Sequence, residues 1–213
     1  MPGRKRHEGD SERAPHHSPR HKLHYWACHH SLRISRQWCR RWLRKWQAAE
    51  VRIIGDEKAQ RALRFAAYHL IAAANPADEH VSIGARGLTG EAYRGHVFWD
   101  TEIYMLPFYV FTDPPAARAL LMYRYHTLDA ARRKARSHGY RGALCAWESA
   151  DTGDETTPRT VVAPSGQVVT LLTGEREHHI SADIAYAVWQ YWRATGDDGF
   201  MLLQRIWPLT SPR

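Results

Sequence analysis

The stretch Ile83–Pro107, IGARGLTGEAYRGHVFWDTEIYMLP, is the feature around which the rest of the chain is organised. Four glycines precede an aromatic and acidic cluster that contains Phe98-Trp99-Asp100. The glycines indicate tight turns or close approach to the backbone. An indole next to a carboxylate suits a sugar, because pyranose C–H faces stack on aromatic rings and hydroxyls donate hydrogen bonds to carboxylates. The stretch therefore predicts part of a sugar-binding site.

Nucleotide binding is the alternative for this glycine-rich stretch. The segment GARGLTG lacks the Gly-Lys-Ser/Thr ending of a phosphate-binding P-loop. It also does not follow a clear strand with GxGxxG spacing. Both observations disfavour a nucleotide site.

A second loop, 140–157, repeats the same chemistry in the sequence YRGALCAWESADTGDETT. Trp147 is followed directly by Glu148, and three more acids, Asp151, Asp154 and Glu155, come after them. Two Trp-carboxylate dipeptides, each after a glycine-containing turn, predict that the loops face one another across a site. The alternative stays open: Trp147 closes a core and the acids belong to a solvated loop.

The body of the chain is expected to be mainly helical. Apolar residues recur at helical spacing over 57–74, 100–111, 115–137 and 181–195. Asp56, Asp100 or Thr101, and Ser181 are the expected N-caps of three of these helices.

Two finer expectations concern these elements. The helix over 115–137 should place Arg118 and Arg124 mostly on the face away from the core. The helix over 181–195 should bury Ala182, Ala185, Val188, Trp189 and Trp192. Between the two helices, Val161–Leu172 reads as a β-hairpin around the turn Pro164-Ser165-Gly166.

The positive charge of the chain belongs to its N-terminal arm. The 213 residues have a formal charge of +8, yet residues 1–45 alone carry 12 lysines and arginines against 3 acids. Residues 1–24 are expected to be disordered. A basic arm can bind phosphate backbones, although a solvated tail is the commoner case.

The tryptophans of the arm have an open interpretation. Trp38, Trp42 and Trp46 recur every four residues among arginines, and such a stripe is able to stack bases. It is more often a helix laid on a core with basic side chains at its edge.

Other features concern the location of the chain. There is no apolar run long enough for a membrane helix, and the basic N-terminus lacks the apolar core of a secretory signal. The three cysteines are an odd number without metal-ligand spacing, which favours a reduced, cytoplasmic chain with no metal.

Three runs together resemble glycoside hydrolase family 65, which includes maltose, trehalose and kojibiose phosphorylases and acid trehalases. They are GARGLTGEAYRGHVFWDTEIYMLPF, GALCAWESADTGDETTP and EHHISADIAYAVWQYW, and the resemblance extends over roughly 46–203. It implies a mainly α fold that forms the N-terminal part of an (α/α)₆ barrel. The domain would occupy 38–203, between a non-homologous arm at 1–37 and a divergent tail at 204–213.

The resemblance also implies roles for residues. Asp100 and Glu148 would accept hydrogen bonds from a glucosyl unit, Trp147 would stack on it, and Trp99, next to Phe98, would shape the pocket. The family cleaves α-linked glucose disaccharides with inversion, by hydrolysis or with inorganic phosphate as co-substrate. It implies no other cofactor and no membrane, and it leaves open a homodimer for full-length relatives.

The sequence also departs from the family pattern. No GPDEYH-like segment, which carries the family's general-acid glutamate, occurs here, and the phosphate loop and the N-terminal β-sandwich are missing. We therefore expect little or no catalysis by this chain alone. The alternative is a non-catalytic module that binds sugar, or nucleic acid through the Trp/Arg arm. A third possibility is an incomplete barrel that leaves apolar helix faces exposed and does not fold stably.

Overall fold

The computed structural model describes residues 35–88, 90, 92–204 and 211–212. The chain divides into two compact units, Met1–Arg44 and Lys45–Arg213, and each is described by itself. The expected disorder at 1–24 and most of the expected tail at 204–213 fall outside the described residues. The domain borders expected from the sequence stay predictions.

In the first unit, the described residues belong to a helix that spans 35–49, as the tryptophan spacing predicts. The rings of Trp38 and Trp42 lie 5.5 Å apart, as neighbours on one helix face do. Within this unit Trp38 is 60% exposed, and the expectation that the stripe lies on a core stays a prediction.

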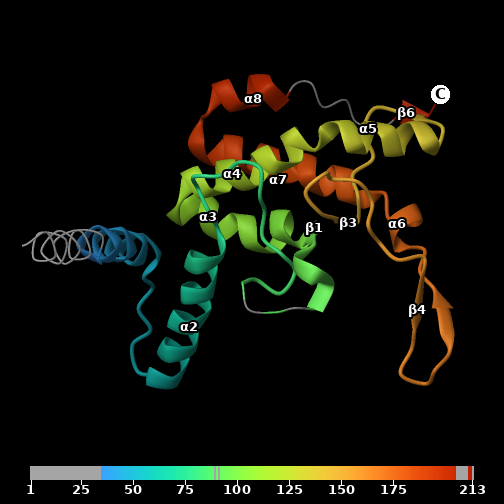
Figure 1. Cartoon of the computed structure of the whole chain (residues 1–213). Coiled ribbons are helices and arrows are strands. Elements are labelled where there is room, and N and C mark those ends of the chain that lie inside the picture. The colour runs from blue at the N-terminus through green and yellow to red at the C-terminus, as the bar shows by residue number, and fades with distance from the viewer. Residues whose placement is uncertain (1–34, 89, 91, 205–210, 213) are drawn as a thin grey trace, which may run out of the picture. The chain divides into compact units, whose positions relative to one another are not determined.

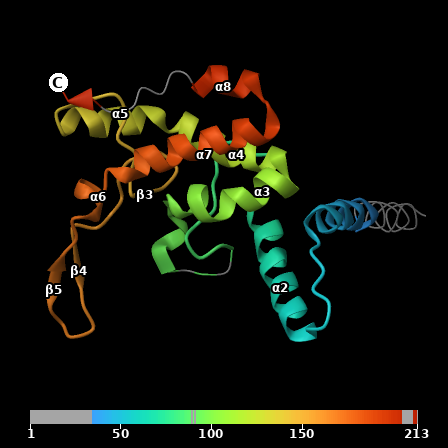
Figure 2. The same ribbon diagram turned by 180° about the vertical axis from the view of Figure 1, so that it is seen from behind.

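The second unit is mainly helical (Figure 1). Two views show α4 and α7 side by side, and the β4–β5 hairpin points away from the helices (Figures 1 and 2). The helical elements are α2 (Glu57–Ala73), η1 (Ala92–Gly95), η2 (Thr101–Met105), α3 (Leu106–Thr112), α4 (Pro114–His126), α5 (Leu128–Ser137), α6 (Thr173–Arg176), α7 (His179–Thr195) and α8 (Asp198–Gln204).

Helix α2 agrees with its sequence prediction to within one residue. The carboxylate of Asp56 accepts a hydrogen bond from the Ala59 amide at 2.9 Å, which satisfies one of the free N–H groups of the first turn. The N-cap predicted from the sequence is therefore confirmed.

The helix predicted from Asp100 is a short π-helix, η2, that continues into α3. Asp100 is in a helical conformation and its side chain makes no capping hydrogen bond, so the expectation that it caps this helix is wrong. Thr101 is buried and its hydroxyl donates to the carbonyl of Ile83 at 3.3 Å instead. The junction is thus fixed by tertiary contacts rather than by a local cap.

The helix predicted over 115–137 is two helices, α4 and α5, which are separated at Thr127. The Thr127 hydroxyl donates to the Tyr123 carbonyl at 2.8 Å, a local bond that competes with helix continuation. Arg124 is 3% exposed, so the expectation that it lies away from the core is wrong. Its partner, described below, explains the burial.

Helix α7 begins two residues earlier than predicted, at His179. Ser181 lies inside its first turn, where the hydroxyl accepts from the Cys145 amide at 3.0 Å, so Ser181 is not the N-cap. The predicted core face is also mostly wrong, because Ala182 is exposed and Trp189 is 49% exposed while Val188 alone of the set is buried. The helix carries a second apolar stripe, and the protein buries that one: Ile180, Ile184, Ala187, Val188 and Tyr191.

The main core lies where α3, α4, α7 and α8 meet. It is filled by side chains such as Leu106, Tyr109, Leu121, Ala187 and Phe200. Large apolar side chains stay exposed on the helices around it, among them Tyr104 at 68%, Phe111 at 79% and Trp189 at 49%.

The strands form three antiparallel pairs among the described residues. The predicted hairpin is confirmed as β4 (Thr160–Val162) with β5 (Val168–Thr170). The other pairs are β1 (Val97–Phe98) with β3 (Glu148–Ser149), and β2 (Tyr140–Arg141) with β6 (Ser211–Pro212). None of the described helices has the length and apolar character that crossing a bilayer requires.

Candidate functional site

Strands β1 and β3 bring the two Trp-carboxylate dipeptides together. They pair in antiparallel register, with Phe98 opposite Glu148 and Val97 opposite Ser149. Trp99-Asp100 therefore follows one strand at the place where Trp147 precedes the other. The sequence prediction that the two loops face one another is correct in this geometric sense.

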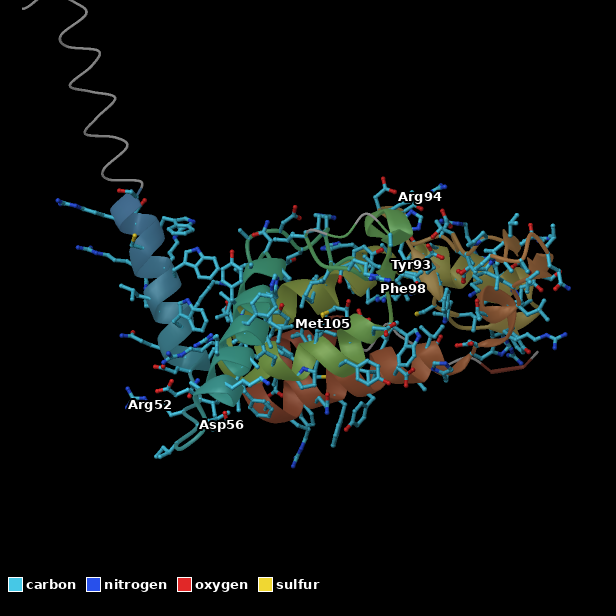
Figure 3. All side chains as sticks on the ribbon, turned by 90° about the horizontal axis from the view of Figure 1, so that it is seen from below. Arg52, Asp56, Tyr93, Arg94, Phe98 and Met105 are labelled. Atoms are coloured by element: carbon cyan, nitrogen blue, oxygen red, sulfur yellow. The ribbon has the colours of Figure 1, made fainter. Side chains whose placement is uncertain are left out.

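The ring of Phe98 contacts two other aromatic rings, those of Trp147 and Tyr93. It is 5% exposed, and its ring meets the ring of Trp147 edge to face with centroids 4.9 Å apart. Tyr93 contacts it with the same geometry at 5.2 Å (Figure 3). Such contacts favour one ring orientation, and the half-buried Trp147 packs against Phe98 in this way.

Glu148 is a buried carboxylate with a specific partner. The residue is 6% exposed, and its Oε1 lies 2.7 Å from Nδ1 of His96. The same ring nitrogen lies 3.4 Å from the Thr156 hydroxyl. Burying a carboxyl group without a hydrogen-bond partner would be costly, and His96 supplies that partner. His96 lies directly before strand β1, in the aromatic and acidic cluster of the Ile83–Pro107 stretch, but no local pattern predicts its contact with Glu148, 52 residues further along.

Trp99 and Asp100 lie at the other edge of the site. Trp99 and Trp147 both pack against a second apolar cluster that includes Cys145 and Ile184. The Trp99 ring is 5.0 Å from that of His179 in an edge-to-face arrangement. Asp100 is exposed, so its carboxylate is accessible to solvent and to a ligand.

His179 and His178 diverge, as adjacent histidines usually do. His179 bonds to Asp183 at 2.6 Å and to Glu177 at 3.2 Å, and the bond to Asp183 raises its pKa above the ordinary value. His178 instead contacts the ring of Tyr140. The described residues include no group of three or more His, Cys, Asp or Glu side chains that could hold a metal ion.

A buried ion pair lies behind this edge of the site. Arg124 of α4 donates to both oxygens of Glu102, from Nε at 2.8 Å and from Nη2 at 2.9 Å. Glu102 is fully buried in η2, which follows Asp100 directly. Burial alone would lower the pKa of Arg124, but the attraction of Glu102 and their hydrogen bonds outweigh it and raise that pKa. Arg124 therefore stays charged, and its two hydrogen bonds to Glu102 anchor η2 to α4.

Comparison with known proteins gives a consistent result. Residues 64–205 match the glycosyl hydrolase family 65 central catalytic domain. The chain is 58% identical over 154 residues to a kojibiose phosphorylase of Caldanaerobacter subterraneus subsp. tengcongensis, which covers 72% of this chain and 20% of that protein. It is 42% identical over 161 residues to a kojibiose hydrolase of Flavobacterium johnsoniae. That alignment covers 76% of this chain and 22% of the hydrolase.

A solved structure shows the same similarity. It is described as a candidate kojibiose phosphorylase from the human microbiome and aligns with a TM-score of 0.65 at 32% identity. The alignment covers 74% of this chain and 19% of that one. The chain thus spans about a fifth of the length of the relatives it matches.

Proposed function

Because this chain belongs to glycosyl hydrolase family 65, we propose that its paired dipeptides form a glucosyl-binding subsite within an (α/α)₆ barrel. The observation that carries the proposal is the β1–β3 pairing, which sets Phe98 opposite Glu148 and so places the two Trp-carboxylate dipeptides next to one another at one end of the strand pair. The subsite consists of Phe98, Trp99, Asp100, Trp147 and Glu148.

Each side chain has a role that its environment supports. Glu148 holds one oxygen against His96, and within the described part of the chain its other oxygen accepts no hydrogen bond from protein. That oxygen and the exposed Asp100 carboxylate accept hydrogen bonds from glucosyl hydroxyls. The ring of Trp147 stacks on the sugar, while Phe98 orients Trp147 and Trp99 shapes the pocket.

The proposed substrate is an α-linked glucose disaccharide, cleaved with inversion by phosphorolysis or hydrolysis. Kojibiose is the first candidate, because relatives that are 50–58% identical to the chain are kojibiose phosphorylases. Inorganic phosphate is the co-substrate if the reaction is phosphorolysis.

We expect the 213-residue chain alone to bind sugar without cleaving it. An inverting reaction needs a protonated carboxylic acid next to the leaving oxygen. Glu102 forms a buried ion pair with Arg124, and Glu177 forms a hydrogen bond with His179. Glu155 has a pKa held below the usual range, because hydrogen bonds from Lys134 and Thr157 outweigh the effect of burial. None of the three suits the role of a general acid.

Sugar binding is tested by titrating the chain with glucose and kojibiose in an isothermal calorimeter. The variant Glu148→Gln should weaken binding about 10- to 100-fold, since a hydrogen bond to a charged group contributes about 1.5–3 kcal/mol. The variant Trp147→Ala removes the ring that stacks on the sugar and should weaken binding roughly tenfold. Trp189→Ala, which removes a half-exposed indole from α7, is the matched control and should bind like the wild type. Equal binding by all four proteins would contradict the proposed subsite.

Cleavage is tested separately with kojibiose, trehalose and maltose, with and without phosphate. We expect no release of glucose or glucose phosphate above background. Robust turnover by this chain alone would contradict the expectation of an inactive chain but would leave the binding subsite standing.

Nucleic-acid binding by the basic helix is the second candidate, and the helical segment that places Trp38 between Arg36 and Arg40 favours it. Salt-dependent DNA binding that disappears on deletion of residues 1–45 would support it. A chain that binds DNA equally well without these residues would refute it.

A further inference from the structure

Glu155 lies outside the proposed subsite, yet its carboxylate accepts hydrogen bonds from the main chain of two subsite residues. Its Oε2 accepts from the Trp147 amide at 2.9 Å, and its Oε1 accepts from the Glu148 amide at 3.2 Å. A side chain seven and eight residues further along the loop thus binds the backbone of both members of the dipeptide. An ordinary turn has no such arrangement, because its amides bond to nearby carbonyls or to water.

Two other groups fix the Glu155 carboxylate in place. Lys134 of α5 donates to Oε2 at 2.6 Å and also to the Cys145 carbonyl at 3.2 Å. Thr157 donates to Oε1 from its hydroxyl at 2.5 Å and from its amide at 3.3 Å. The side chains of Glu155 and Lys134 are 22% and 11% exposed, so solvent competes little with these bonds. Bonds to an ionised acceptor are also about twice as strong as neutral ones.

Thr156, the residue after Glu155, contacts both Glu148 and its partner His96. The Thr156 amide donates to the Glu148 carbonyl at 2.9 Å, and the Thr156 hydroxyl lies 3.4 Å from His96 Nδ1. On the far side, a Cβ added to Gly174 would lie 3.0 Å from Cδ of Glu155. The carboxylate is therefore held by α5 and by the dipeptide, and α6 lies next to it.

We propose that Glu155 is the positioning residue of this site: it fixes the backbone of Trp147 and Glu148 so that the indole and the carboxylate face the sugar. Glu155 does not itself touch the sugar. The part of the proposal that concerns sugar rests on the proposed glucosyl subsite, whereas the part that concerns the backbone does not.

The variant Glu155→Gln tests the proposal, with Asp154→Asn as the matched control. The two amides donate to different oxygens of Glu155, and glutamine has only one acceptor oxygen. In Glu155→Gln one of the two amides would therefore face the NH₂ group, which is itself a donor. Asp154 is the adjacent acid of the same loop, but it is half-exposed, its carboxylate pairs with Arg133, and its amide donates to the Thr152 hydroxyl rather than to the dipeptide. Amide hydrogen exchange by NMR and glucose affinity by calorimetry are measured on the full chain for each protein.

In Glu155→Gln we expect the amides of Trp147 and Glu148 to exchange at least about tenfold faster while the α4 and α7 amides stay protected, and glucose affinity to fall about tenfold, equivalent to about 1.4 kcal/mol. Asp154→Asn should match the wild type in both measurements. Unchanged exchange at the two amides in Glu155→Gln would overturn the proposal. Faster exchange with unchanged glucose affinity would overturn its sugar-binding part.

A wild-type measurement decides the matter if Glu155→Gln does not fold. The NMR chemical shift of an amide proton changes when the carboxylate to which it donates titrates. The chemical shifts of the Trp147 and Glu148 amide protons should therefore change with pH at the same midpoint as the Glu155 Cδ signal. Amide shifts that do not follow Glu155 would overturn the proposal. If the wild type binds no glucose, the proposed subsite fails, and the exchange and titration results still decide whether Glu155 positions the dipeptide.

Discussion

Replacing Arg124 by methionine should destabilise the protein more than any substitution of a surface charge. Arg124 is 3% exposed and Glu102 is fully buried, and two hydrogen bonds of 2.8 and 2.9 Å join them. Removing the guanidinium leaves a buried carboxylate without a partner, which costs about 3–5 kcal/mol. That is a large share of the 5–15 kcal/mol (roughly) by which domains are usually stable.

The double variant Glu102→Leu/Arg124→Met separates the loss of the pair from the loss of one partner. Replacing both members of a buried ion pair by apolar residues of similar size is often neutral or stabilising, so the double variant should recover most of the stability lost in Arg124→Met. Arg133→Met is the control, because its pair with Asp154 is about half-exposed at both ends and should contribute less than about 1 kcal/mol.

The assay is urea unfolding followed by circular dichroism. With a slope of about 2 kcal/mol per molar urea, the loss in Arg124→Met lowers the midpoint by roughly 2 M, while the control moves by less than about 0.5 M. If Arg124→Met unfolds at the same urea concentration as the control, the pair does not stabilise the fold and the reasoning is refuted. A double variant as unstable as Arg124→Met would show that the packing of the arginine, rather than its charge, matters.

Three further predictions concern local structure. Asp56→Ala should cost about 0.5–2 kcal/mol in urea unfolding, because it removes the observed N-cap of α2, and a loss below about 0.2 kcal/mol would contradict this. Gly153→Ala should destabilise by about 1–3 kcal/mol, because residue 153 has φ +75 and the added Cβ would lie 2.3 Å from the Cβ of Thr127; an unchanged melting temperature would contradict it. The bond to Asp183 raises the pKa of His179, so its stabilising effect is complete below about pH 6.5 and is lost as the pH rises through the higher folded value. NMR titration should show a midpoint above 6.5 for His179 that falls in Asp183→Asn, and a wild-type midpoint at or below 6.5 would be inconsistent.

Much of the local structure follows from the sequence because its causes are local. Asp56 caps α2 by accepting from the amide of Ala59, three residues further along the chain. The turn Pro164-Ser165-Gly166 lies between the strands that it joins. The periodicity of apolar residues places the helices, although it does not place their ends to the residue. The two Trp-carboxylate dipeptides also stand out in the sequence, since each is contiguous and each follows a glycine-containing turn.

The errors arose where local patterns allow more than one answer. Helix α7 carries two apolar stripes, and periodicity does not say which one meets α3 and α4; the protein buries Ile180 and Ile184 and leaves Trp189 half-exposed. Ser181 has the composition of an N-cap, but it serves the Cys145 amide of a loop more than 30 residues away. An arginine on an amphipathic helix is normally solvated, and only the position of Glu102 reverses that expectation for Arg124.

The residue types expected of a sugar site, an indole followed by a carboxylate, can be recognised twice in the sequence. The tertiary structure alone decided that these residues meet, through the pairing of Phe98 with Glu148, and which side chains support them. His96 faces Glu148 and Glu155 binds the backbone of Trp147-Glu148 because the chain folds back on itself there. A contact between residues 52 apart depends on every turn and helix between them, so no local pattern contains it.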